Sequence, residues 1–134
     1  MIADVILQMI RAAVPGVTVY DGRVPDSPDS GVPPERYVVL YVDTGTRSAE
    51  TVEHRSTSET WRWQTTCVAP DRGMAAWLAR RIGDALTDTR PAVAGWSCGL
   101  IEHTFSQLST SDELVQERPV VSAIDQYRLI AERL

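Results

Sequence analysis

The sequence Gly-Trp-Ser-Cys-Gly at residues 95–99 is the part of the chain that most resembles an enzyme motif. It matches G-x-S-x-G, in which a tight turn from a strand into a helix exposes a serine hydroxyl as a nucleophile. Here the following residues, Leu100 to Phe105, have the pattern of a strand, and the only histidine after Ser97 is His103. The pattern therefore predicts a turn that enters a strand, without a catalytic serine.

The other residues with metal-binding side chains are too scattered to form a site. His54 stands in a charged stretch, while Glu102 and His103 would point to opposite faces of a strand. A zinc site needs about four convergent ligands, and Asp26 and Asp29 do not complete a calcium-loop pattern. We therefore predict no catalytic, cofactor-binding or metal-binding residues, no cofactor, and no enzymatic activity.

The two cysteines, Cys67 and Cys98, lie far apart and form no C-x-x-C pair. Both stand in segments with the pattern of strands, so we expect two small buried thiols. A disulfide or a metal ligand is the alternative interpretation.

The composition is that of one globular domain with an acidic surface. The chain has 134 residues, 43% of them hydrophobic, and we expect a single domain spanning residues 1–134. Its 13 basic residues are all arginine and stand against 18 acidic residues, which gives a net charge of −5. Such a balance disfavours nucleic-acid binding, which depends on clustered cations. No apolar run approaches the length of a membrane span, and residues 1–13 lack the pattern of a signal peptide.

Two amphipathic helices are predicted. The first spans residues 1–13 and ends at Pro15-Gly16, and the second begins after Asp71, its expected N-cap. The apolar stripe of the second helix consists of Met74, Trp77, Leu78, Ile82, Ala85 and Leu86. We expect this stripe to face a sheet, so that Trp77 joins Trp61 and Trp63 in one core.

Five strands are expected around these helices. Their ranges are Val17–Tyr20, Arg36–Asp43, Glu59–Val68, Trp96–Leu108 and Val120–Leu134. The last segment also fits a helix, but its β-branched start favours a strand. The order α-β-β-β-α-β-β indicates an α+β fold, with a mostly antiparallel sheet of about five strands and two helices packed on one face.

Three polar stretches are long for so small a domain. They are Asp21–Glu35, a loop rich in proline, and Thr44–Ser58 and Ser109–Arg118, each expected to be a hairpin or a loop. Long connections are usually functional. Because these stretches carry no recognisable chemistry, we expect them to bind other protein subunits.

Five segments of the chain resemble the tail terminator proteins of long-tailed bacteriophages, also called tail completion proteins, which include the minor tail protein U family. The segments, in order along nearly the whole chain, are VYDGRVPDSP, RYVVLYVD, WRWQTTCVAPDRGMAAWLARRIGDAL, GWSCGLIEH and AIDQYRLIAERL. The resemblance is one of residue type and spacing.

This resemblance implies a structural virion protein of the tail and neck, synthesised in the cytoplasm of the bacterial host. It implies a ring of copies of the chain, which we expect to be a hexamer. Before assembly, a monomer is the alternative state of the chain. The ring would cap the head-proximal end of the tail tube, stop its polymerisation and form the head–tail joining interface. The implied partners are the tube protein and a head-closure or connector protein, with DNA passing through the lumen without specific binding. The alternatives are another neck ring, for head closure or head–tail joining, and an unrelated small binding module.

Overall fold

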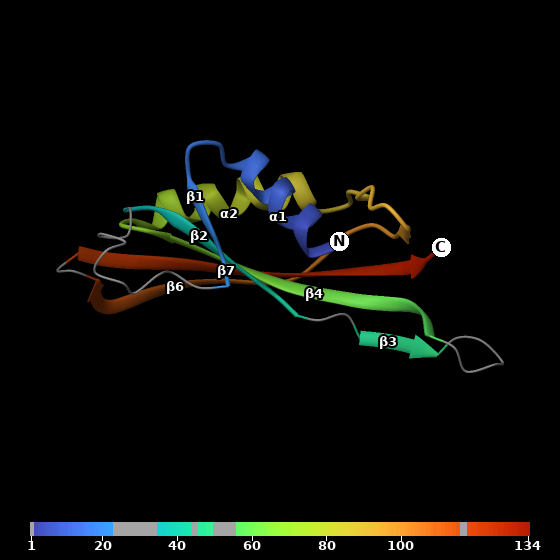
Figure 1. Cartoon of the computed structure of the whole chain (residues 1–134). Helices are drawn as coiled ribbons and strands as arrows, with labels where there is room; N and C mark the ends of the chain where they lie inside the picture. The colour runs from blue at the N-terminus through green and yellow to red at the C-terminus, as the bar shows by residue number, and fades with distance from the viewer. Residues whose placement is uncertain (1, 23–34, 44–45, 50–55, 116–117) are drawn as a thin grey trace.

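A sheet with two helices on one face makes up the fold of the computed structural model, which describes residues 2–22, 35–43, 46–49, 56–115 and 118–134. The elements are α1 (Ile2–Ala13), β1 (Thr18–Asp21), β2 (Tyr37–Val42), β3 (Thr46–Ala49), β4 (Ser56–Ala69), α2 (Arg72–Leu86), β5 (Trp96–Cys98), β6 (Glu102–Val115) and β7 (Arg118–Arg133). Both helices lie over the same face, and β3 with the adjoining end of β4 extends away from them (Figure 1). None of the described helices is long and apolar enough to cross a membrane.

The sheet has seven strands in five positions. The order is β1-β2-β4-β7-β5, with β3 beside β4 and β6 beside β7. β2 and β3 pair with the same edge of β4, and β5 and β6 pair with the same edge of β7, because the other edges of β4 and β7 pair with each other. The β1–β2 pair is parallel and all others are antiparallel. The expected fold class and element order are therefore confirmed.

The expected strand Trp96–Leu108 is wrong as one continuous element, because it is divided between β5 and β6. Gly99 N–H still donates to Ile130 O on β7 at 2.9 Å, and a Cβ at Gly99 would lie 3.2 Å from the same oxygen. Ile101 then leaves β7 and exchanges two 2.9 Å hydrogen bonds with the segment after α2, through Thr89 O and Asp88 N. The Ile101 side chain is fully buried there, so apolar burial replaces strand pairing at this point.

The polar stretches Thr44–Ser58 and Ser109–Arg118 contain hairpins. β3 pairs with the start of β4, and the distal ends of β6 and β7 pair with each other up to Val115 and Arg118. Most of Asp21–Glu35 lies outside the described residues.

The second helix begins as predicted, and most of its predicted apolar stripe is buried or half-buried, but Trp77 is not. Asp71 Oδ1 accepts a 2.8 Å hydrogen bond from Met74 N, which confirms the N-cap. The buried residues of α2 are Ala75, Leu78, Ile82 and Leu86. Trp77 is 48% exposed and stacks on the Arg81 guanidinium, 5.6 Å from the ring centroid. The predicted burial of Trp77 is therefore wrong, because the helix packs through its small Ala75 and the sheet-facing stripe lies about half a turn from Trp77.

The core lies between the helices and the alternate residues of β4 and β7. Trp61 and Trp63 are 8% and 3% exposed, as expected for this part of the predicted core. In β7 every second residue is buried, from Val121 to Ala131. This alternation confirms that the ambiguous segment Val120–Leu134 is a strand. Across the two strands, Trp63 and Tyr127 stack with ring centroids 5.8 Å apart.

Candidate functional site

The serine of the G-x-S-x-G segment lies in a strand. Gly95 has φ 84°, which forms the turn, and Ser97 follows in β5 opposite Glu132 of β7. His103 lies opposite Tyr127, five residues farther along β7, which is about 17 Å at the rise of an antiparallel strand. The predicted turn into a strand is confirmed, and Ser97 and His103 are too far apart to form a nucleophile–base pair.

His103 and Glu102 have separate partners on the two faces of the sheet. His103 Nε2 lies 2.9 Å from Oδ1 of Asp125, and Asp125 is only 4% exposed. Glu102 accepts from the Arg128 guanidinium on the other face. Within the described ranges no three histidine, cysteine or acidic side chains form a group that could hold a metal ion. His54, Asp26 and Asp29 lie outside those ranges.

Both cysteines are buried free thiols, which confirms the sequence-based prediction. Burial raises the pKa of the Cys67 thiol to about 12, and the Asp125 carboxylate acts in the same direction. Burial also raises the pKa of Cys98, against a smaller opposite effect of Arg90. Since the thiolate is the reactive form, neither side chain is suited to act as a nucleophile or a metal ligand.

We expect neither thiol to react rapidly with a disulfide reagent in the folded protein at about pH 8, because protonation and burial both suppress the reaction. Two thiols should react in denaturing urea. The absorbance of the released chromophore measures both, and the variants Cys67→Ala and Cys98→Ala assign each signal. A native thiol that reacts as fast as in urea would show that its strand opens readily.

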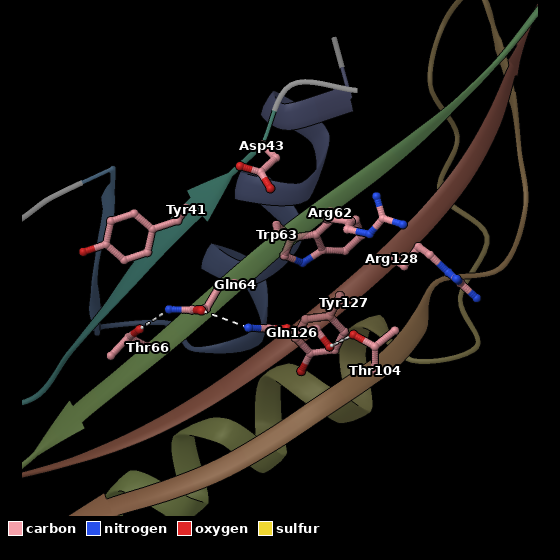
Figure 2. Close-up of a pocket in the computed structure, with 10 residues that line it drawn as sticks. All are labelled: Tyr41, Asp43, Arg62, Trp63, Gln64, Thr66, Thr104, Gln126, Tyr127 and Arg128. Carbon is pink, nitrogen blue, oxygen red and sulfur yellow. Dashed lines mark hydrogen bonds between the residues drawn. The ribbon is translucent and has the colours of Figure 1, made fainter. Parts of the chain in front are cut away.

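The sheet face opposite the helices is not covered by any described element (Figure 1). A hollow of about 690 Å³ lies on it. It is lined mainly by polar side chains from four strands, which are Tyr41, Asp43, Arg62, Gln64, Thr66, Thr104, Gln126 and Arg128 (Figure 2). Hydrogen bonds link several of them: Gln126 Nε2 of β7 donates to Gln64 Oε1 of β4 at 3.3 Å, and within β4 Gln64 Nε2 donates to Thr66 Oγ1 at 3.4 Å. We call this surface the open sheet face.

Two arginines stand directly opposite each other on the open sheet face. Arg62 of β4 is in register with Arg128 of β7, and both lie at the same side of the hollow in Figure 2. Arg128 is neutralised by Glu102, whereas Arg62 has no hydrogen-bond or ion-pair partner in the described part of the chain. Like charges directly across a sheet disfavour pairing, so this arrangement is suited to contact with solvent or with an acidic partner.

Exposed apolar side chains lie among these polar groups. Tyr41 is in register with Gln64, Phe105 with Gln126, and Ile130 follows two residues after Arg128 on the same face. All three are exposed. Interfaces between proteins that also exist separately contain a similar mixture of apolar and polar surface area.

The sequence indicated only half of the open sheet face. In the segment Glu59–Val68, the alternation of polar and apolar residues predicts that Arg62, Gln64 and Thr66 point away from the core, and the structure agrees. The contribution of β7 was missed because Val120–Leu134 also fitted a helix. The residue order contains no local signal that Gln126 would lie beside Gln64, 62 positions away.

No family model matches the chain, and no curated protein matches it in sequence. In the search of solved structures, the fold resembles a chain in the virion of a native gene transfer agent particle. The TM-score is 0.67 at 15% identity, over 95% of this chain and 91% of that one. A second solved chain has a TM-score of 0.52 at 19% identity, over 95% and 94% of the two chains. The protein therefore shares its fold, along almost its whole length, with a component of a gene transfer agent virion.

Proposed function

We propose that this protein is a structural component of a phage-like virion that forms a ring at the head-proximal end of the tail tube. There it stops tube polymerisation and presents a surface to a head-closure or connector protein. The observation that carries the proposal is the fold shared with a gene transfer agent virion component over 95% of the chain. The five segments that resemble tail terminator proteins support the same position in the virion.

The borders of the sheet suit a ring. β1 and β3 form one border and β5 and β6 the other, and within the described residues no strand lies on the outer side of any of them. Exposed strand edges favour pairing with further protein. Because the two borders differ, a contact between them runs head to tail, and such contacts close into a ring when the rotation between subunits closes.

The surface charge suits a channel through which DNA slides. Strong binding to DNA requires clustered cations, and this chain has 13 basic against 18 acidic residues. The arginine pair on the open sheet face is partly neutralised by Glu102 and stands near Asp43. We infer that DNA passes the ring without specific binding.

The length of tails in particles that lack the protein tests the proposal. Without a terminator, each tube end still offers the surface that the next ring of tube subunits uses, so polymerisation continues. We expect overlong, irregular tails without heads in electron micrographs, and normal particles after complementation with the wild-type chain. Tails of normal length on heads that leak DNA would contradict the terminator role and favour a head-closure ring.

A further inference from the structure

The exposed face of α2 carries an aromatic side chain that is held in place without being buried. Trp77 is 48% exposed. The Arg81 guanidinium stacks on its ring at 5.6 Å, and Arg81 Nε donates a 3.2 Å hydrogen bond to Ala13 O at the end of α1. An anchored arginine therefore restricts the tryptophan. Side chains ordered before binding lose less entropy when a complex forms, and tryptophan and arginine are the residues most enriched at energetically important interface positions.

A second arginine stands beside Trp77. Arg36 borders the same shallow hollow as Trp77, and its guanidinium contacts Met74 Sδ at 3.4 Å. The carboxylate of Asp71, which also lines this hollow, accepts a hydrogen bond from Met74 N. We call the surface formed by Arg36, Trp77 and Arg81 the arginine–tryptophan ridge. It is a locally basic surface on a chain with a net charge of −5.

A groove of about 590 Å³ lies on the neighbouring flank of the same helix, between α2 and β6. Its α2 wall is made of small residues, Ala76, Ala79 and Gly83, and Leu108 of β6 faces them and is exposed. The groove thus has an apolar strip between α2 and Leu108, with room for a large side chain.

The charge of the groove is opposite to that of the ridge. Asp84, Asp88 and Asp125 line it, against a single guanidinium, that of Arg80. Asp84 and Asp88 are exposed, and Asp125 is fixed at the floor by His103 at 2.9 Å. A partner that fits this groove therefore combines an apolar or aromatic side chain with a guanidinium group.

We propose that the arginine–tryptophan ridge of one copy of this chain docks in the α2–β6 groove of the next copy. Trp77 enters between Leu108 and the small residues of α2, and Arg81 faces the carboxylates of Asp84 and Asp88. Ridge and groove share no residue, so the ridge of a copy can bind one neighbour while its groove binds another, and the contact then runs head to tail; a wild type that stops at the dimer would instead show a reciprocal two-fold contact and would contradict it. The proposal rests on the ring-forming role proposed above and names the contact that builds the ring.

Two variants remove one half of the contact each. Trp77→Glu removes the aromatic anchor and adds a repulsive charge, while the groove stays intact. The double variant Ala76→Arg with Asp84→Arg fills the groove and reverses its charge, while the ridge stays intact. All three positions are exposed on α2, so both proteins should fold, as circular dichroism and thermal unfolding would show. Leu100→Glu is the matched control, since Leu100 is 49% exposed but belongs to neither surface.

Sedimentation velocity up to about 1 mM, where even a millimolar contact is populated, measures self-association. The wild type and Leu100→Glu should associate beyond the dimer, and each contact variant alone should remain monomeric, with association weakened at least about 30-fold. An equimolar mixture of the two contact variants should form dimers and nothing larger, because one intact ridge then meets one intact groove.

Three results would overturn this contact: a wild type that stays monomeric or stops at the dimer at the highest concentration, variants that associate normally, or a mixture that yields no dimer. Tail length in particles lacking the protein is a separate measurement. Failure of the contact together with overlong tails would therefore reject this interface and leave the terminator role intact.

Discussion

Replacing Trp63 by alanine should lower the free energy of unfolding by about 3–5 kcal/mol, the usual cost of removing a buried aromatic side chain. Trp63 is 3% exposed and stacks on Tyr127 with ring centroids 5.8 Å apart. Tyr127 is itself almost completely buried, so the remaining side chains have little freedom to fill the space. Urea denaturation followed by circular dichroism measures the change, which should appear as a lower midpoint with an unchanged slope.

The matched control is Trp77→Ala, which removes the same side chain from an exposed position. Because Trp77 lies outside the core on α2, we expect a loss of less than about 1 kcal/mol. Equal losses for the two variants would mean that α2 faces the sheet with the stripe that contains Trp77, in conflict with the structure.

Removing β3 should abolish capping of the tail tube while the domain still folds. β3 contacts β4 and makes no other substantial contact with a described element, and its hairpin extends away from the helices and the core (Figure 1). Loops and short surface elements can be shortened at little cost in stability. A projecting hairpin without a packing role is a surface suited to contact with the tube or with a neighbouring subunit, in agreement with the expectation from the sequence.

The deletion can be designed from the register. Asp43 N donates to Arg62 O, and Ser58 lies four residues before Arg62, so a linker from Asp43 to Ser58 must span about 14 Å along the strand. Six glycine and serine residues in place of residues 44–57 reach about 20 Å. Buried Ser58 and Glu59 remain, and with them the 3.3 Å contact between Glu59 and Arg133.

Particles complemented with this deletion variant should have the same overlong, headless tails as particles without the protein, when viewed by electron microscopy. A control chain keeps β3 and replaces only residues 50–55 by glycine and serine, and it should restore normal tails. If the deletion variant also restores normal tails, β3 takes no part in capping and the contact with the tube lies on another surface.

Several features of this protein follow from short stretches of sequence. Alternation within Glu59–Val68 determined which side chains of β4 are buried, because successive side chains of a strand point to opposite faces. Asp71 marked the start of α2 because its carboxylate reaches a backbone N–H three residues ahead. These effects act over a few residues, so the fold class and the element order were predictable. For the same reason, the polar half of the open sheet face that comes from β4 was predictable.

Other features depend on contacts between segments that are distant in sequence. Packing of α2 on the rest of the domain buries Ala75 and leaves Trp77 exposed, although the spacing of Trp77 fits the apolar stripe. The division of β5 from β6 depends on the hydrogen bonds between Ile101 and the segment after α2. The pairing of Gln64 with Gln126 depends on the register of β4 and β7. The sequence by itself therefore determined most of the elements and the buried face of β4, while only the tertiary structure decided the surfaces available to partners, because packing across the whole domain selects which side chains remain uncovered.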